Sequence, residues 1–418
     1  MAEVIQEHNK IPYSLSQEKY GEGLRLPSDM DRWFFQWQWK YNGDSGYYAS
    51  YVIGAKWVED KDGNKLPLVI TTKEGCDKID FLKMFSTCFN SGIAAEEFAK
   101  IYDVDMTQPT IDVPELNSVL SPLIVVHFLS VVQKIVKRGL KKDYVNKEEN
   151  LKKVKGRIDI FRNERKNILT KRYDRVYCKF QEFSENTPEN RLIKKALRFA
   201  QQILNNAAAS KGFAGLQHSV QQFLSAFSNV DEQIEVWEVK AIKHNKIFKE
   251  YDAAIKLAQL ILRRYDYNIT NITAKEEKCP VFWLDMALLY EHYVLGLLKE
   301  AYGDKIKYQA HGYSGYPDFI CYEPKVVMDT KYIPRFENGS LDSDIVRQLS
   351  GYARDRKLFK DRPAENIPCL VIYPKESEAE NPFKDKPLES FLEKEDNQYW
   401  NFYRVAVPLP MLQTPQGN

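Results

Sequence analysis

The N-terminal part of the chain alternates short runs of aromatic and β-branched residues with polar, glycine-containing segments. Three of these runs have the length and composition of β-strands: Trp33–Trp39, Tyr47–Ile53 and Leu66–Thr72. The intervening residues 41–44 and 60–64 contain Asn-Gly and Asp-Gly pairs, which favour tight hairpin turns. The pattern predicts a β-rich domain over residues 1–113, with one helix near Ala94–Tyr102.

The middle of the chain, residues 114–275, carries apolar residues at helical spacing. Four helices are predicted, at Leu120–Arg138, Asn190–Asn205, His218–Phe227 and Phe248–Tyr265. Gly139 is a natural end for the first helix, and Thr187 followed by Pro188 is a natural start for the second. We therefore expect a helical middle region.

The last part, residues 276–418, mixes one long amphipathic segment with short β-like runs. The predicted order is a helix at Trp283–Ala301, strands at Ile306–Gln309, Pro317–Tyr322 and Lys325–Tyr332, a helix at Ile345–Phe359, and strands at Cys369–Tyr373 and Phe402–Val407. This order is typical of a mixed sheet flanked by helices. The whole chain is then a multi-domain protein of the mixed α+β class.

Charge is balanced overall but not locally. The 418 residues include 60 Lys+Arg and 58 Asp+Glu, so a protein that coats nucleic acid by bulk charge is excluded. The stretch Val131–Lys179 has 17 basic and 6 acidic residues, a local excess of +11. It is either a solvated face or a surface that binds nucleic acid or an acidic partner.

Neither membrane insertion nor thiol chemistry is indicated. The first residues lack an apolar signal core, and the most apolar run, Leu120–Val132, contains His127 and is too short to span a bilayer. The six cysteines form no CxxC pair, which argues against a cysteine-based zinc site. We expect a cytoplasmic protein with no membrane partner.

The residues with the clearest chemical meaning are Asp318, Asp329 and Lys331. Asp329 and Lys331 stand two apart on a predicted strand, so their side chains share a face. Glu323-Pro324 offers a tight connection, and the resulting hairpin would bring Asp318 near Asp329. Carboxylates are costly to bury unpaired, whereas Mg²⁺ binds through one or two carboxylates and keeps several waters. A neighbouring lysine can orient the attacking water and offset negative charge on phosphorus.

This spacing matches the PD-(D/E)xK nuclease pattern, and three surroundings support the match. The apolar run Val326–Met328 precedes Asp329 as a buried strand would, and Glu291 lies on a helix before the motif. Gln348 and Tyr352 follow on one face of a predicted helix. Structural roles remain open for the last three: Glu291 and Gln348 as solvated surface residues and Tyr352 as a core aromatic.

Several segments resemble, in order and spacing, the McrC family of nuclease subunits from McrBC modification-dependent restriction systems. They are Arg138-Gly139-Leu140, Tyr144, Val154–Asp159, Glu189–Leu197, Leu289–Glu291, Pro317-Asp318, Asp329–Tyr332 and Gln348–Tyr352. The resemblance runs from about Glu115 to the end. It leaves the role of the first, β-rich domain unassigned.

The resemblance implies a C-terminal restriction-endonuclease-like α/β core that cleaves double-stranded DNA with Mg²⁺, for which Mn²⁺ is a possible substitute. The implied metal ligands are Asp318, Asp329, the carbonyl of Thr330 and Glu291. Lys331 would position or activate the attacking water. Gln348 and Tyr352 would orient Lys331 or hold the phosphate.

The resemblance also implies a partner, an McrB-like AAA+ GTPase ring whose pore receives the non-nuclease portion and whose GTPase is stimulated by it. The sequence has no GxxxxGK[ST] P-loop, in agreement with a motor on a separate chain. The basic stretch Val131–Lys179 falls in the docking portion, and we favour docking over DNA contact there. Two alternatives stand: a RecB-like DNA-repair nuclease, and a non-catalytic activator of an AAA+ ring. The second is disfavoured because Asp318, Asp329 and Lys331 are all present.

Overall fold

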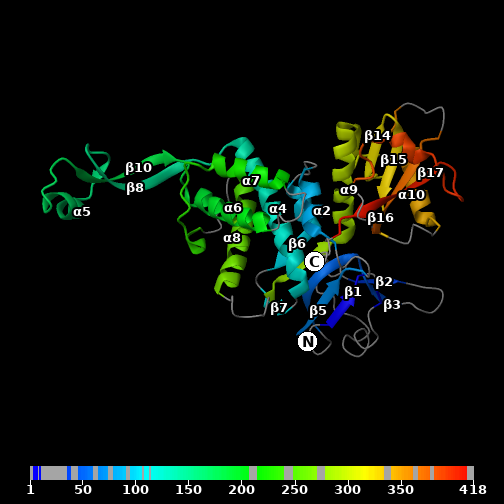
Figure 1. Ribbon diagram of the computed structural model, residues 1–418, viewed down its shortest axis with the longest axis horizontal. Coiled ribbons are helices and arrows are strands. Elements are labelled where there is room, and N and C mark those ends of the chain that lie inside the picture. Colours follow the sequence, from blue (N-terminus) through cyan, green and yellow to red (C-terminus); the bar gives the residue numbers. More distant parts are fainter. Residues whose placement is uncertain are drawn as a thin grey trace, which may run out of the picture. The chain divides into compact units, whose positions relative to one another are not determined.

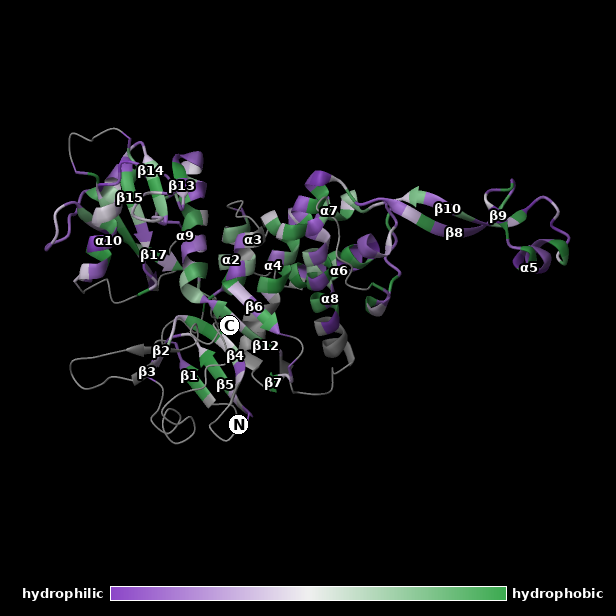
Figure 2. Ribbon diagram, turned by 180° about the vertical axis from the view of Figure 1, so that it is seen from behind, coloured by the Kyte–Doolittle hydropathy of each residue, from purple (hydrophilic) through white to green (hydrophobic). Residues whose placement is uncertain are grey.

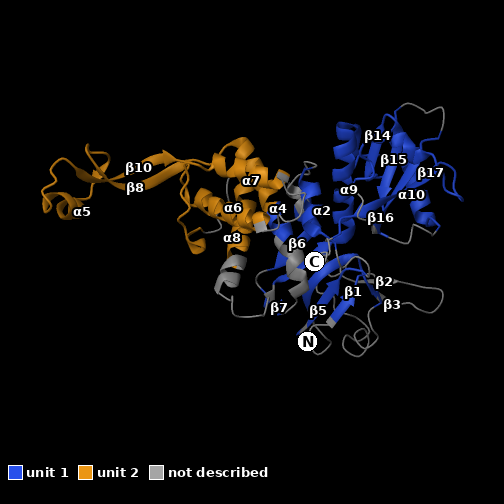
Figure 3. Cartoon of the chain, in the orientation of Figure 1, with its two compact units in different colours: residues 1–126, 273–418 blue, residues 127–272 orange. Residues whose placement is uncertain are grey.

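The protein folds into two compact units, one formed by residues 1–126 and 273–418 and the other by residues 127–272 (Figure 3). The structure, a computed structural model, describes residues 3–7, 9–10, 35–38, 46–59, 65–73, 79–90, 95–105, 108–112, 114–206, 214–239, 248–270, 278–333, 340–360, 366–376 and 381–411. The division into three domains at 113/114 and 275/276 stays a prediction. Within the first unit, the predicted N-terminal and C-terminal domains share a sheet.

The first sheet of this unit has five strands in the order β1-β5-β4-β12-β6 (Figure 1). Their bounds are β1 Glu3–Gln6, β5 Lys65–Thr71, β4 Val52–Glu59, β12 Val281–Asp285 and β6 Tyr102–Asp105. A separate antiparallel pair joins β2 (Phe35–Gln38) to β3 (Gly46–Ala49). The predicted run Tyr47–Ile53 is therefore two strands, interrupted at residues 50–51. The predicted turns at 41–44 and 60–64 lie outside the described residues.

Strand β12 is the point at which the C-terminal part of the chain enters the N-terminal sheet. It pairs antiparallel with β4 on one side and β6 on the other. The prediction of one helix over Trp283–Ala301 is wrong at its start, because Trp283 lies in β12. Helix α9 (Met286–Tyr302) begins after Asp285, whose carboxylate caps it by accepting from Leu288 N at 2.9 Å. Apolar residues continue from β12 into α9, so the spacing of apolar residues alone does not show where the strand ends and the helix begins.

Two glycines allow close approaches in this unit. Gly54 on β4 has φ +150°, and a Cβ there would lie 2.1 Å from the carbonyl oxygen of Phe282 in β12. Gly296 on α9 lies against Thr87 of α2 (Phe81–Asn90), where a Cβ would come within 2.7 Å of Thr87. The remaining elements of this part are α3 Ala95–Ile101, which confirms the helix expected near Ala94–Tyr102, and the short pair β7 Ile111–Asp112 with β11 Lys278–Cys279.

The second sheet carries the candidate chemistry and has the order β13-β14-β15-β16-β17. Its strands are β13 Ile306–Tyr308, β14 Phe319–Tyr322, β15 Lys325–Thr330, β16 Cys369–Glu376 and β17 Phe402–Leu409. The first three are antiparallel neighbours, and β15, β16 and β17 run parallel. The predicted mixed sheet is confirmed, as is the β14–β15 hairpin through Glu323-Pro324.

Helices α9 and α10 (Ser343–Ala353) flank this sheet (Figure 1). Leu349 of α10 packs in one core cluster with Val327 of β15 and Val371 of β16, all three fully buried. The predicted helix Ile345–Phe359 is too long, since α10 ends at Ala353. No helix in the described part of the chain is long and apolar enough to cross a membrane.

The second unit contains a helical group. Its helices are the C-terminal part of α4 (Pro114–Arg138), α6 Pro188–Asn206, α7 Ala214–Ala226 and α8 Lys249–Thr270. Two predicted boundaries are confirmed: Gly139, at φ +93°, follows the last residue of α4, and the hydroxyl of Thr187 accepts from Asn190 N at the start of α6. Helices α4 and α7 begin earlier than the predicted Leu120 and His218.

The middle region is not only helical, because the basic stretch forms a long hairpin that projects from these helices (Figure 1). β8 (Asp143–Leu151) pairs antiparallel with β10 (Val176–Ser184), and β10 also pairs with β9 (Arg157–Ile158). Short helical turns, α5 Ile160–Asn163 and η2 Glu164–Ile168, form the distal end. We call residues 143–184 the hairpin arm. Its surface is largely hydrophilic (Figure 2). The sequence therefore lacks the alternation of apolar and polar residues that identifies a strand, because both faces of β8 are largely exposed.

Candidate active site

Asp318 is fixed at the entry to β14 by two donors from the end of β15. Its Oδ2 accepts from the backbone N–H of Thr330 at 2.7 Å and from the Thr330 hydroxyl at 2.6 Å. The carbonyl of Asp318 accepts from Gln309 N at 2.9 Å, which closes the base of the loop between β13 and β14. The carboxylate is thereby held at the edge of the sheet where β15 ends.

Asp329 and Lys331 lie on the same face, as the strand periodicity predicts. Lys331 Nζ lies 2.5 Å from Asp329 Oδ2, an ion pair in which the carboxylate is 2% exposed and the lysine side chain 23% exposed. Lys331 N donates to Ile372 O at 2.8 Å, so the backbone continues its parallel pairing with β16 beyond Thr330. Apart from this ion pair, Asp329 Oδ2 is a buried oxygen with no hydrogen-bond partner in the described part of the chain. This buried oxygen retains a capacity to bind a cation.

Glu291 reaches the same place from helix α9. Its Oε1 accepts from Gln309 Nε2 at 3.2 Å, and Gln309 directly precedes the loop that leads to Asp318. Burial first, and the nearby Asp318 second, raise the pKa of Glu291 to about 8. The carboxylate therefore lies near Asp318, on a side chain that is half-buried.

The Gln348 and Tyr352 side chains meet on α10. Gln348 Nε2 donates to Tyr352 Oη at 3.1 Å, the i, i+4 contact that the spacing predicts. Tyr352 is 5% exposed and lies close enough to Lys331 to contribute to the rise in the pKa of that lysine. Gln348 is exposed. The structure therefore places all of the sequence-predicted site residues in one neighbourhood of the first unit.

The buried carboxylates of the site repel one another, and a bound cation would offset this repulsion. Burial and then repulsion from Asp318 raise the pKa of Asp329 to about 7, and burial also raises the pKa of Asp318. Burial opposes the charge on Lys331, but Asp329 and Asp318 outweigh it and raise the pKa of the lysine above its ordinary value. One ammonium thus faces two carboxylates, with Glu291 beside Asp318, and the set fits a divalent cation bound to oxygen ligands.

The carboxylates are not, however, already gathered around one point. No group of three or more His, Cys, Asp or Glu side chains in the described part of the chain is arranged to hold a metal ion. Each carboxylate contacts a different donor: Asp318 contacts Thr330, Asp329 contacts Lys331, and Glu291 contacts Gln309.

Two contributors to the site were missed by the sequence analysis. Gln309 holds Glu291, and nothing in the sequence signals this role. For Thr330 the sequence implies a role only for the backbone carbonyl, yet its side-chain hydroxyl also donates to Asp318. Its place between Asp329 and Lys331 was the available signal.

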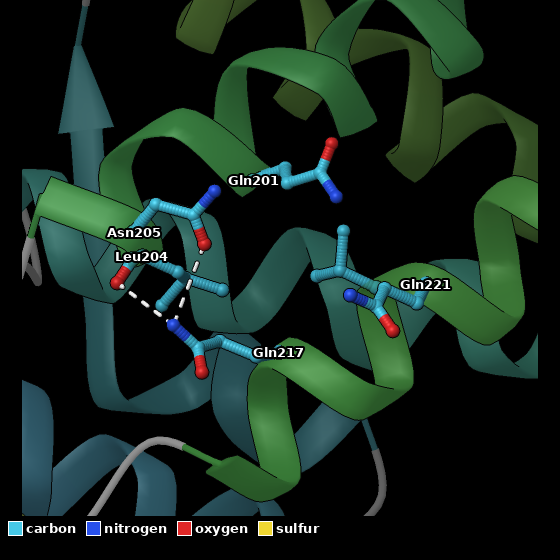
Figure 4. A pocket seen from close by; sticks show the side chains of 6 residues that line it. Gln201, Leu204, Asn205, Gln217 and Gln221 are labelled. Carbon is cyan, nitrogen blue, oxygen red and sulfur yellow. Dashed lines mark hydrogen bonds between the residues drawn. The ribbon is translucent and has the colours of Figure 1, made fainter. Parts of the chain in front are cut away.

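A separate hollow lies between α6 and α7 in the second unit (Figure 4). Its lining residues are Gln201, Leu204, Asn205, Gln217, Val220 and Gln221. Gln217 Nε2 donates to Leu204 O at 3.5 Å and to Asn205 Oδ1 at 3.4 Å. The lining offers amides and two aliphatic side chains but no carboxylate, imidazole or thiol.

The family model described as "McrBC 5-methylcytosine restriction system component" matches residues 81–350, well over half of the chain. The match includes Glu291, Asp318, Asp329, Lys331 and Gln348. No curated protein sequence matches the chain.

Two solved assemblies from Thermococcus gammatolerans are similar over much of the chain. One is a refined half-complex from the tetradecameric assembly of McrB AAA+ hexamers with bound McrC, at 15% identity and a TM-score of 0.37, covering 99% of this chain and 95% of that chain. The other is the McrBC complex, at 13% identity and a TM-score of 0.30, covering 71% of this chain and 87% of that chain.

Proposed function

Because the chain belongs to the family of McrBC 5-methylcytosine restriction system components, we propose that it is the metal-dependent DNA endonuclease subunit of such a system. One observation carries the proposal: Asp318, Asp329 and Lys331 lie together at one edge of a mixed sheet, and Glu291 of α9 lies beside Asp318. For the same reason, the β13–β17 sheet with α9 and α10 is taken as a restriction-endonuclease-like core of the PD-(D/E)xK type.

The residues fit one Mg²⁺, or Mn²⁺ in its place. Asp318, Asp329 and the carbonyl of Thr330 would hold it, and Glu291 would complete the set directly or through water. When bound, such a cation polarises the phosphodiester and lowers the pKa of the attacking water. Thr330 would serve the site twice, because its N–H and hydroxyl orient Asp318 and its carbonyl would be a ligand of the cation.

Lys331 acts through its positive charge. Its pKa is raised, so at neutral pH the amine holds a proton and cannot accept one from water. It therefore positions the water and offsets the charge that builds on the phosphoryl oxygens. Tyr352, held by Gln348 at 3.1 Å, restrains the lysine from the α10 side.

The test is Mg²⁺-dependent cleavage of plasmid DNA by the chain together with its AAA+ partner and GTP. Asp329→Asn and Lys331→Ala should each lower cleavage on the order of a thousandfold, because each removes several kcal/mol of transition-state stabilisation. Asp304→Asn, at an exposed position after α9, is the matched control and should cleave normally. Circular dichroism and partner binding should be unchanged in all three variants. Undiminished cleavage by Asp329→Asn or Lys331→Ala would sink the assignment.

The hairpin arm is proposed to dock an McrB-like AAA+ GTPase ring and to stimulate its GTPase. The distal end of the arm presents apolar side chains to solvent, with Ile160 at 78% exposure, Leu169 at 71% and Tyr173 at 77%. Exposed apolar residues at the end of a projecting element are typical of a protein-binding surface. Basic residues around them, among them Lys152, Lys153, Arg165 and Arg172, suit an acidic partner surface. The near-neutral charge of this chain also agrees with DNA binding by the partner rather than by this chain.

A further inference from the structure

Residues 310–316, which we call the tyrosine loop, join β13 to β14 and end two residues before Asp318. The loop reads Ala-His-Gly-Tyr-Ser-Gly-Tyr, and its two tyrosines are exposed, Tyr313 at 82% and Tyr316 at 56%. Large aromatic side chains with this exposure have an open ring face. The loop therefore presents aromatic surface directly beside the candidate active site.

The loop is held in place by a single buried carboxylate, Asp355. Its Oδ2 accepts from Tyr313 N at 2.5 Å and from Ser314 N at 2.9 Å, and its Oδ1 accepts from Lys357 N at 2.8 Å. Burial opposes the charge of Asp355, but these backbone donors outweigh it and lower the pKa of the carboxyl. The side chain is 5% exposed. The hydrogen bonds to Asp355 thus fix the backbone that carries the exposed tyrosines.

Two glycines let the loop approach the surrounding residues closely. A Cβ at Gly312 would lie 2.6 Å from Asp355 Oδ2, so a larger residue would displace the carboxylate that holds the loop. Gly315 has φ +123°, and a Cβ there would lie 3.2 Å from Tyr352 Oη. The loop is therefore in contact with the tyrosine that restrains Lys331.

A lysine from outside the loop lies against its exposed side. The His311 ring stacks on Tyr316, with centroids 4.8 Å apart and an interplanar angle of 10°. Lys357 Nζ lies 2.9 Å from His311 Nδ1 and 5.6 Å from the centroid of the Tyr313 ring. An ammonium only donates, so Nδ1 accepts and the proton of the ring is on Nε2. Nε2–H is then a donor available to a phosphate oxygen.

The segment that follows α10 adds further positive charge. Arg354, Arg356, Lys357 and Lys360 are all exposed, and the one acidic residue among them, Asp355, is occupied with backbone donors. Exposed aromatic rings interleaved with cations are the combination that binds single-stranded nucleic acid, with bases on the rings and phosphates on the cations.

We propose that the tyrosine loop and the basic residues 354–360 form a nucleotide clamp that stacks an unpaired base of the DNA on Tyr313 next to the phosphodiester to be cut. This inference rests on the nuclease function proposed above and adds a preference for one form of its DNA substrate. In a fully paired duplex each base is covered on both faces by its neighbours, so Tyr313 stacks only on a base that has left the stack. The site therefore favours DNA that is locally unpaired beside the scissile bond.

The test compares the affinity of the full-length chain for a fully paired duplex and for the same duplex with a short single-stranded gap, with Ca²⁺ in place of Mg²⁺. The wild-type protein should bind the gapped duplex more tightly. Tyr313→Ala should weaken binding to the gapped duplex by about 5- to 100-fold and remove the preference. Tyr313→Phe should retain it. Lys357→Gln should lower the slope of log affinity against log salt by about 1.

Trp400→Ala is the matched control, because Trp400 is an aromatic side chain of the same unit with 85% exposure. Equal binding by Tyr313→Ala and Trp400→Ala on both duplexes would overturn the clamp. So would a Tyr313→Ala protein that keeps its affinity for DNA but loses the AAA+ partner, since the loop would then be a protein-docking surface.

A second readout does not depend on affinity. Gapped DNA with 5-iodouracil in the gap should photo-crosslink to the peptide that contains Tyr313, and a crosslink confined to other peptides would contradict the clamp. Failure of the nuclease function itself has a different signature, namely a wild-type protein that binds the gapped duplex but does not cleave DNA with Mg²⁺, GTP and the partner.

Discussion

Tyr332 donates its hydroxyl to the buried carboxylate of Glu7 at 3.1 Å, although 325 positions of the chain separate the two residues. Lys73 completes the contact: its Nζ donates to Tyr332 O at 3.0 Å and lies 4.0 Å from the centroid of the Tyr332 ring. Tyr332 directly follows Lys331. The N-terminal sheet, which the sequence left without a role, therefore holds the end of the strand that carries the candidate site.

Glu7→Gln should stabilise the protein at pH 8 and have little effect at pH 5. Burial raises the pKa of Glu7 from its ordinary 4.5 to about 7; Lys73 and Tyr332 counteract the rise, and Asp285 adds to it. Between these values the folded protein keeps a proton that the unfolded chain has released, so the stability of the wild type falls as the pH rises through this window. Glutamine keeps an acceptor for Tyr332 and removes the buried charge. The gain at pH 8 should reach about 3 kcal/mol at most.

Urea unfolding at the two pH values measures this gain. Glu393→Gln is the control, because that side chain is exposed in the same unit. A difference between Glu7→Gln and wild type that is the same at pH 5 and pH 8 would contradict a protonated Glu7.

Thr330→Val should weaken metal activation without altering the fold. Valine keeps the shape of threonine and the backbone N–H bond to Asp318, but it lacks the hydroxyl that donates to Asp318 Oδ2 at 2.6 Å. Loss of a group that orients a metal ligand costs about 10- to 100-fold in metal affinity or activity. The Mg²⁺ concentration for half-maximal cleavage should rise by this factor.

Thr87→Val is the matched control for this titration, since the Thr87 hydroxyl donates only to Lys83 O along α2. Its Mg²⁺ dependence should equal that of the wild type. An unshifted midpoint for Thr330→Val would show that Asp318 needs no help from the hydroxyl, or that it is not a ligand.

The part of the site that the sequence predicts is the part that local register determines. Asp318, Asp329 and Lys331 are joined by one hairpin, so strand periodicity and a tight connection are enough to bring them together. The i, i+4 spacing of Gln348 and Tyr352 is equally local. Glu291 needed the packing of α9 against the sheet, which the sequence only suggested.

What the sequence could not predict depends on contacts between distant segments or on exposed surfaces. Strand β12 enters the N-terminal sheet through pairing with β4, far away in the chain, and its apolar residues merge with those of α9. The hairpin arm lacks the alternation of a half-buried strand because it packs on nothing over much of its length. Asp355 fixes the tyrosine loop through backbone N–H groups, which carry no sequence signature.

Asn190→Ala should destabilise the second unit at the root of the hairpin arm. Asn190 is fully buried, donates from Nδ2 to Lys141 O at 2.9 Å and to Glu185 O at 2.7 Å, and accepts from Tyr251 Oη at 2.7 Å. These carbonyls lie on either side of the arm, so one side chain ties both of its ends to α6. Alanine removes all three hydrogen bonds, although Tyr251 Oη still accepts from Lys141 N and Glu185 O from Thr187 N, so the cost should be about 2–3 kcal/mol.

Chemical denaturation measures the loss, and limited proteolysis near residues 139–142 and 185–187 locates it. Asn205→Ala is the control on the same helix, because Asn205 is exposed and only accepts a 3.4 Å bond from Gln217 (Figure 4). If the two variants unfold at the same denaturant concentration, Asn190 does not anchor the arm.

Removing apolar surface from the end of the hairpin arm should separate partner docking from DNA contact. Ile160 and Leu169 are exposed, so serine at both positions leaves the packing of the arm intact while removing surface that a protein partner would bury. The affinity for the AAA+ ring and the stimulation of its GTPase should fall at least about tenfold, because burial of each side chain contributes roughly 1.5–3 kcal/mol. The affinity for DNA should not change, since phosphates bind the cations and not these side chains. Trp237→Ser, at 78% exposure in the same unit but outside the arm, should leave both activities unaltered. A double variant that stimulates the GTPase normally but binds DNA poorly would assign the arm to DNA instead of the ring.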